Sequence, residues 1–158
     1  MDEDILFGIT EEDQEGVDAH VDTQTEKFLL FSSDSLMFGV PAENVVEVLT
    51  SHSITTLPLV PSYIQGIINL RGKIIPILDI RLLLGKWPKD DCCIMILDID
   101  GTSIGILVDE VYRMLDIQKD SIMSVPAHNA QKLVSGMCSL PDEQTMLVFD
   151  SYQLLNRS

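Results

Sequence analysis

The stretch Phe28–Leu49 reads FLLFSSDSLMFGVPAENVVEVL, and Ile94–Leu115 reads IMILDIDGTSIGILVDEVYRML. The two stretches align without a gap, and aliphatic residues, phenylalanine or glycine fill matching positions in both. The correspondence continues further along the chain, where Gly66 matches Gly136. Two copies of a short unit indicate a pseudo-symmetric pair of subdomains, because a solenoid needs three or more repeats.

The two copies differ at one tight turn. Asn69-Leu70-Arg71-Gly72 in the first copy is replaced by Ser139-Leu140-Pro141-Asp142 in the second. A feature that the shared fold does not need twice is a candidate for function. The turn of the first copy is therefore the first place to look for a binding site.

The composition indicates an aliphatic, mildly acidic body preceded by a strongly acidic tail. Hydrophobic residues make up 46% of the chain and aromatic residues 6%. The net charge is −15, and residues 1–26, with ten acidic and no basic residues, supply −10 of it. Nucleic-acid binding requires clustered Lys and Arg, so we expect no nucleic-acid partner. No apolar run approaches the roughly 20 residues of a membrane span and no signal peptide opens the chain, so we expect a cytoplasmic protein without direct membrane insertion.

The apolar pattern predicts many short strands separated by turns. Two hairpins are expected at residues 28–40 and 93–108, the second around an Asp100-Gly101 turn. A short helix is expected after Pro41, with Val45, Val48 and Leu49 on its inner face. Further strands are expected at residues 63–71, 73–78, 133–140 and 145–149, and short helical turns at 80–84 and 150–155.

This pattern predicts a mainly β fold of small barrels, and the duplication favours two barrels packed side by side. We expect residues 1–26 to be a disordered acidic tail and residues 27–158 to be the folded domain. The first barrel unit is expected at about 27–88 and the second at about 92–158. The repeat leaves open whether each copy folds on its own strands or the copies exchange strands.

Residues suited to catalysis or metal binding are scattered. His20, His52 and His128 have no spacing that suits a metal site, and we expect no metal and no cofactor. We interpret Cys92, Cys93 and Cys138 as reduced, mostly buried thiols. The sequence therefore predicts a protein that is not an enzyme, and a small thiol-dependent enzyme using Cys92 or Cys138 is the remote alternative.

The segment Tyr63–Gly85, YIQGIINLRGKIIPILDIRLLLG, is the most distinctive part of the chain. Arg71 lies at a tight turn between two apolar strands, where it either ties down a loop or a carboxylate, or borders an apolar patch and bonds a partner. Backbone geometry explains the glycines best. The residues expected to shape this signature are Gly66, Gly72, Pro76 at a strand edge or bulge, Asp79 as a helix cap, and Arg81.

The combined motifs of this segment, Gly-x-x-Asn-Leu-Arg-Gly, Pro-x-x-Asp and Arg-x-x-Leu-Gly, resemble the signature of the CheW family of chemotaxis coupling proteins. The segments FGVPAENVVEVL and GILVDEVYRML are similar to further parts of the family pattern. The resemblance covers the chain from Lys27 onwards and leaves the acidic tail outside it.

The resemblance implies a non-enzymatic adaptor built of two five-stranded SH3-like barrels around a shared hydrophobic core. Such an adaptor couples the cytoplasmic tips of chemoreceptors to the regulatory domain of the histidine kinase CheA, within receptor arrays and with weak self-association or ring assembly. The alternative is the same adaptor role in a non-flagellar pathway, such as pilus motility or second-messenger control. The receptor-facing groove of the family maps onto Val45, Glu47, Asn69, Arg71 and, less directly, Val108. No motif places the kinase contact.

One feature lies outside the resemblance. The tail contains the apolar cluster Ile5–Ile9 framed by acidic residues. This cluster is either part of a solvated tail or a short docking motif.

Overall fold

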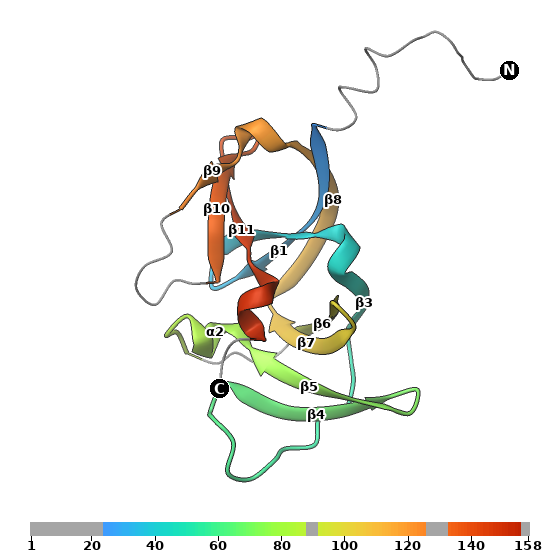
Figure 1. Ribbon diagram of the computed structural model, residues 1–158. Helices are drawn as coiled ribbons and strands as arrows, with labels where there is room; N and C mark the ends of the chain where they lie inside the picture. The colour runs from blue at the N-terminus through green and yellow to red at the C-terminus, as the bar shows by residue number, and fades with distance from the viewer. Residues whose placement is uncertain (1–23, 88–91, 126–132, 156–158) are drawn as a thin grey trace, which may run out of the picture.

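The computed structural model describes residues 24–87, 92–125 and 133–155, most of which lie in strands (Figure 1). Short turns and short helical segments connect the strands. The first-copy strands are β1 (Thr25–Ser33), β2 (Leu36–Pro41), β3 (Val45–Leu49), β4 (Ile64–Leu70) and β5 (Lys73–Asp79). The second-copy strands are β6 (Cys93–Ile99), β7 (Thr102–Val108), β8 (Glu110–Gln118), β9 (Met123–Ser124), β10 (Val134–Ser139) and β11 (Thr145–Phe149). The helical segments are η1 (Ala42–Asn44), α2 (Ile80–Leu83), η2 (Lys119–Ser121) and η3 (Ser151–Leu154).

The strands form two sheets, and equivalent strands of the repeat follow one another in the same order in both sheets. The six-stranded sheet runs β8-β1-β2-β11-β10-β9, and the five-stranded sheet runs β3-β6-β7-β5-β4. The repeat matches β8 with β3, β1 with β6, β2 with β7, β11 with β5 and β10 with β4, so the order of these strands is the same in both sheets. Both sheets form small SH3-like barrels, as predicted, and we call them the upper barrel and the lower barrel after their places in Figure 1. The upper barrel has one strand more than expected, the two-residue β9, whose counterpart below is the single bridge between Thr55 and Ile67.

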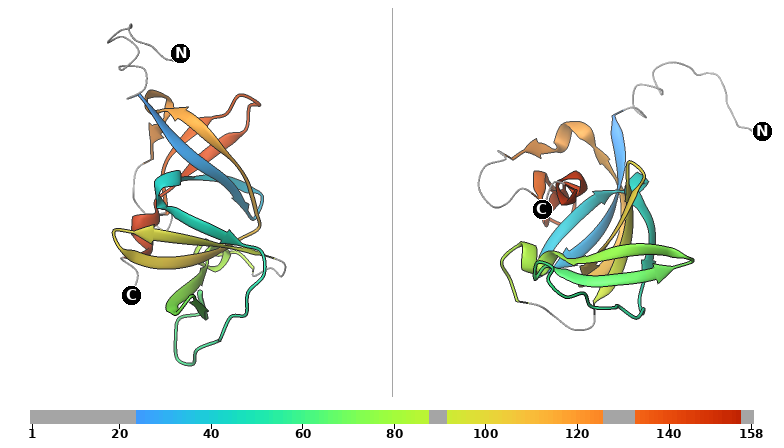
Figure 2. Two further views of the ribbon diagram at one scale, coloured as in Figure 1. Left: turned by 90° about the vertical axis from the view of Figure 1, so that its right-hand side faces the viewer. Right: turned by 60° about the horizontal axis from the view of Figure 1, so that its bottom comes forward.

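Each barrel takes strands from both copies. In the upper barrel, β1 pairs with β8 from Thr25 opposite Gln118 to Ser32 opposite Glu110, and β2 pairs with β11 in parallel. In the lower barrel, β6 and β7 of the second copy pair with β3 and β5 of the first. The boundary near residues 88–92 therefore separates the copies but not the barrels, and the expected units 27–88 and 92–158 do not coincide with the sheets. Figure 2 shows β1 and β8 together in the upper barrel, and β3 together with β6 and β7 in the lower one.

The exchange explains why the repeated strands have almost unbroken apolar runs. Along β1, Phe28 and Leu30 enter the interior of the upper barrel, while Leu29 and Phe31 enter a central core between the barrels. Strand β6 alternates in the same way between the lower interior and the central core. A strand buried on both faces lacks the polar alternation of a half-exposed one. In the central core, the rings of Phe31, Phe38 and Phe149 contact one another with centroids 5.3 to 6.0 Å apart.

One predicted element is wrong. The helix expected after Pro41 is limited to the three residues of η1, and Val45, Val48 and Leu49 belong to strand β3. The spacing of these residues fits a helix, but pairing with β6 holds them extended, with Glu47 opposite Ile96. Valine favours a strand because its branched side chain suits the pleated surface.

At the N-terminal end, β1 already includes Thr25 and Glu26, which were expected in the disordered tail. Residues 1–23 of the tail, with the Ile5–Ile9 cluster, lie outside the described residues.

Gly66 allows two backbone segments to approach each other closely. It lies at a bulge of β4 with φ +150°, and a Cβ there would fall 2.1 Å from the carbonyl oxygen of Thr55. Its counterpart Gly136 lies opposite β9, where a Cβ would be 2.9 Å from the oxygen of Met123. The repeat therefore retains glycine where the closing segment of each barrel crosses the neighbouring strand.

Candidate partner-binding surface

The turn between β4 and β5 presents Arg71 at the edge of the lower barrel. Arg71 and Gly72 both have positive φ, 52° and 86°, as a two-residue hairpin turn requires. The side chain of Asn69 fixes this turn, since its Oδ1 accepts a hydrogen bond from the Gly72 N–H at 2.9 Å. The Arg71 side chain is 68% exposed and forms an ion pair with Glu47 of β3. Three of the five predicted groove residues are therefore adjacent in space.

The other two predicted groove residues differ from this group. Val45 is half-buried at the start of β3 and packs against the central core. Val108, the last residue of β7, is fully buried in that core, so its side chain offers no surface to a partner. The apolar group that the strand exposes is instead Val46, with 53% of its surface accessible. The sequence pattern did not select Val46 because it predicted a helix here. In a strand, neighbouring side chains point to opposite faces, so Val46 points to solvent while Val45 points to the core.

A cavity of about 360 Å³ lies beside Arg71. Its lining combines apolar side chains with a few charged groups from β3, β5, β6 and the β4–β5 turn. The lining residues that matter here are Val46, Leu70, Arg71, Lys73, Ile75 and Asp98. Apolar walls beside exposed charged groups suit the docking of a protein segment. We call this region, together with Glu47 and Asn69, the lower rim.

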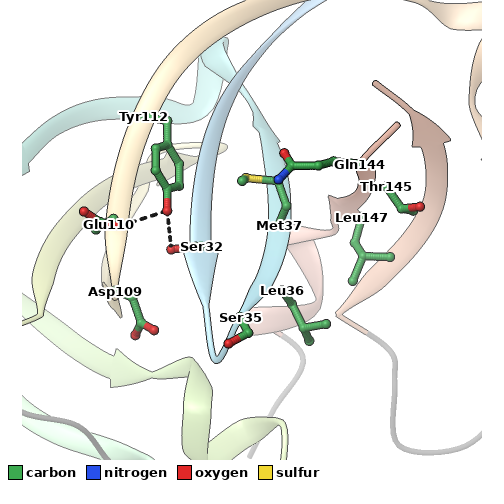
Figure 3. Close-up of a pocket in the computed structure, with 10 residues that line it drawn as sticks. All are labelled: Ser32, Ser35, Leu36, Met37, Asp109, Glu110, Tyr112, Gln144, Thr145 and Leu147. Carbon is green, nitrogen blue, oxygen red and sulfur yellow. Dashed lines mark hydrogen bonds between the residues drawn. The ribbon is translucent and has the colours of Figure 1, made fainter. Parts of the chain in front are cut away.

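The corresponding end of the upper barrel holds a larger cavity of about 520 Å³ (Figure 3). Tyr112 of β8 occupies the position that matches Val46, and its hydroxyl donates to Glu110 Oε1 at 2.9 Å or to Ser32 Oγ at 3.2 Å. Leu36, Met37 and Leu147 give this cavity its apolar side. Sequence reasoning missed the cavity, because its walls come from three segments far apart in the chain.

Arg81 lines neither cavity, although its partner Asp109 lines the larger one, and it joins the two barrels. Its Nε and Nη2 donate to the two carboxylate oxygens of Asp109, at 2.9 and 2.5 Å, and its Nη1 donates to Asp34 at 3.1 Å. Arg81 follows β5 of the lower barrel, Asp34 lies in the β1–β2 turn of the upper barrel, and Asp109 lies where the chain crosses between them. The hydrogen bonds with Asp109 raise the pKa of Arg81. Arg81 therefore has a bonding role between the barrels that its place in the sequence did not indicate.

The two remaining signature residues lie along β5. Asp79 is buried and caps α2 by accepting a hydrogen bond from the Arg81 N–H at 2.9 Å, and its burial raises its pKa despite this bond. Pro76 precedes the short parallel pairing of β5 with β7, which begins at Ile77. At Pro76, β4 is the single described strand that pairs with β5. Proline has no backbone N–H to donate, and it is tolerated here because no pairing with β7 has begun.

The chemistry of the remaining side chains is simple. The described residues contain no group of three or more His, Cys, Asp and Glu side chains able to hold a metal ion. All three cysteines are free thiols, and burial raises the pKa of Cys138. None of the helical segments in the described residues has the length and apolar character of a membrane span.

The structure thus consists of two fused SH3-like barrels with an exposed charged pair at the end of one barrel. The chain belongs to the CheW-like domain family, whose model matches residues 27–158. It is similar to the chemotaxis protein CheW of Klebsiella aerogenes, with 26% identity over 133 residues that cover 80% of each chain. It is also similar to Protein FrzA of Myxococcus xanthus, with 43% identity over 61 residues, or 39% of this chain and 38% of that protein.

A solved structure agrees with this membership. The crystal structure of the scaffolding protein TtCheW from Thermoanaerobacter tengcongensis matches with a TM-score of 0.73 and 32% identity, over 79% of this chain and 88% of that chain. The resemblance identified from the sequence is therefore confirmed. The protein is a non-enzymatic chemotaxis scaffold, and the thiol-dependent enzyme is set aside.

Proposed function

We propose that this scaffold couples the cytoplasmic tip of chemoreceptors to the regulatory domain of a CheA-type histidine kinase, in the cytoplasm and within membrane-bound receptor arrays. The observation that carries the proposal is the exposed Arg71–Glu47 pair beside Val46 on the lower rim. An exposed ion pair stabilises a fold by only about 0 to 1 kcal/mol. Its placement at the Asn69–Gly72 turn, whose sequence the second copy lacks, therefore favours recognition over stability.

The rim supplies two kinds of contact to a helical receptor tip. Val46 and the apolar wall of the cavity can receive an aliphatic side chain, while Arg71 and Glu47 can hydrogen-bond polar groups and fix the register of the helix. Arg71 has spare donors for this, since the bond to Glu47 uses one nitrogen of a guanidinium with five N–H groups. Each contact is small, so avidity within an array of receptors, scaffolds and kinases would supply the overall affinity.

The test compares Arg71→Ala with the control Lys27→Ala. The control also removes an exposed, ion-paired cation, but from strand β1 of the upper barrel. Both variants are titrated with a receptor signalling fragment and, separately, with the kinase regulatory domain. We expect Arg71→Ala to weaken receptor binding at least tenfold, the range of an interface hot spot, and to leave kinase binding within twofold. Unchanged receptor binding by a folded Arg71→Ala variant would show that Arg71 is structural. Loss of kinase binding alone would place Arg71 on the kinase side.

A second candidate function keeps the adaptor role but changes the pathway. Protein FrzA bears a name different from the chemotaxis proteins, and its match has the higher identity over a shorter stretch. This observation favours retaining a non-flagellar pathway, such as pilus motility or second-messenger control, as the alternative. Deletion of the gene, scored for swimming and for surface motility, separates the two pathways.

A further inference from the structure

We propose that the cavity at the end of the upper barrel is a second protein-binding site, which takes an arginine or lysine side chain of a partner protein and the aliphatic residue next to it. The cation of the partner pairs with Glu110, and the aliphatic residue packs on Leu36 and Leu147. The site lies on the other barrel from the lower rim and shares no residue with it. Binding here therefore goes beyond the receptor contact proposed for Arg71 and does not depend on it.

The cavity has the size and the two kinds of wall that a side-chain site needs. Its volume is about 520 Å³, and ligand sites in proteins range from about 300 to 1,000 Å³. Figure 3 shows hydroxyl and carboxylate groups from β1 and β8 on one side, and apolar side chains from β2 and β11 on the other. Two large apolar groups of the lining remain accessible, since Leu36 is 38% exposed and Tyr112 is 45% exposed. Accessible apolar surface beside a few convergent polar groups is typical of a binding site.

The charge of the cavity favours a cation. Among the described residues, Asp109 and Glu110 are the charged members of the lining, and no lysine or arginine accompanies them. Asp109 is already bound, because both of its carboxylate oxygens accept from Arg81. Glu110 forms no ion pair with any residue that the structure describes, and one of its oxygens accepts from the Tyr112 hydroxyl at 2.9 Å. A carboxylate has about four acceptor sites, so Glu110 can bind a cation and keep the tyrosine.

The turn beside the cavity keeps a serine in an unfavourable conformation. Asp34 and Ser35 form the β1–β2 turn with φ of 52° and 66°, whereas the matching turn of the second copy has Gly101 at its second position. A residue with a Cβ is disfavoured there, because the Cβ approaches the following carbonyl oxygen. The bonds of Asp34 to Arg81 and Asp109 account for the first position. Ser35 lines the cavity, so contact between its side chain and an occupant accounts for the second.

The two barrel ends differ in charge. The lower rim balances two cations, Arg71 and Lys73, with two carboxylates, Glu47 and Asp98. The upper cavity has one carboxylate that is bound and one, Glu110, that has no cation among the described residues. The two ends occupy matching places in the repeat, so the fold that they share does not require this difference. The difference suits two partners of different chemistry, one on each barrel.

The test uses the acetylated and amidated tripeptide Leu-Arg-Leu as the probe, which is titrated into the full chain and followed by amide chemical shifts. We expect saturable shifts around Leu36, Tyr112 and Thr145, with a dissociation constant on the order of 1 mM. The matched probe has citrulline in place of arginine, which keeps the shape of the side chain and removes its charge. This neutral peptide should bind roughly fivefold more weakly, because it cannot form an ion pair with Glu110.

Two variants locate the contact within the cavity. Glu110→Gln should weaken binding of the arginine peptide roughly fivefold and leave the citrulline peptide unchanged. Its control is Glu43→Gln, which removes an exposed carboxylate from η1 and should change binding by less than about twofold. Ser35→Gly relieves the turn, so it should keep or raise the melting temperature while it weakens peptide binding.

Several outcomes would overturn the proposal. They are no saturable shifts at about 10 mM peptide, shifts confined to the lower barrel, equal affinity for the citrulline peptide, and equal affinity of the Glu110→Gln variant. Cavity shifts on concentrating the wild-type chain alone would identify a second copy as the occupant, which would also overturn it. Neither receptor nor kinase is present in this titration, so its failure leaves the adaptor function standing. Unchanged receptor binding by Arg71→Ala would likewise leave the upper cavity to be judged on its own.

Discussion

Replacement of Arg81 by methionine is expected to destabilise the junction between the barrels. The Arg81 side chain is 13% exposed and that of Asp109 is 10% exposed, so water shields the pair poorly. Methionine keeps much of the side-chain volume but leaves two carboxylates, Asp109 and Asp34, without their shared cation. Removal of one partner from a buried ion pair costs about 3–5 kcal/mol, because the other charge stays buried and uncompensated. This loss is a large share of the roughly 5–15 kcal/mol that hold a typical domain folded.

The assay is urea unfolding followed by circular dichroism. With a denaturant slope of about 2 kcal/mol per molar, the expected loss lowers the midpoint by roughly 1.5–2.5 M. Lys27→Met is the matched control, since its partner Asp116 lies 3.0 Å away and the two side chains are 55% and 64% exposed. This control should lose no more than about 1 kcal/mol. The double variant Arg81→Met/Asp109→Asn should lose less than the sum of the single changes. Equal losses for Arg81→Met and Lys27→Met, or strict additivity, would refute the reasoning.

Three further changes test other parts of the fold. Gly66→Ala should lower the free energy of unfolding by about 3 kcal/mol or more, because its Cβ would meet the Thr55 carbonyl. Gly72→Ala, with open space around the new Cβ, should lower it by only about 1–2 kcal/mol, the cost of a positive φ. Similar melting temperatures for the two variants would contradict this. Burial raises the pKa of Asp79 above its ordinary 3.8, so the folded protein binds a proton before the unfolded chain does. The wild type should therefore gain stability relative to Asp79→Asn as the pH falls from the raised folded pKa toward 3.8, and parallel stability curves from pH 7 to 4 would argue against this. Buried Cys138, whose pKa is raised, should react with iodoacetamide far more slowly in the native protein than in urea, and rapid native labelling would show that its site is open.

The local elements could be predicted from the sequence because their signals are local. The Asp100-Gly101 pair predicted a tight hairpin, and both residues have the positive φ that this turn requires. The cap at Asp79 was predictable in the same way. Strand β3 was not, because the spacing of its valines fits a helix as well as a strand, and only its pairing with β6 decides between them.

The arrangement in space depended on contacts that no local pattern encodes. Glu47 and Arg71 are 24 residues apart, and the family resemblance rather than the spacing placed them on one surface. The burial of Val108 follows from the central core, which exists because the copies exchange strands. Arg81 reads as a helix residue in the sequence, yet its partners Asp34 and Asp109 lie 47 and 28 residues away.

The exchange of strands also sets the order in which the protein can assemble during synthesis. Strand β2 is complete at Pro41, yet its neighbour β11 begins only at Thr145. At about 5–20 residues per second, the ribosome needs roughly 5–20 s to make the intervening chain. The β6–β7 hairpin emerges earlier and shares the central core with β1 and β2. All five strands of the lower barrel have been made once β7 ends at Val108, so we expect this barrel to close first and the upper barrel to follow when β8 to β11 emerge.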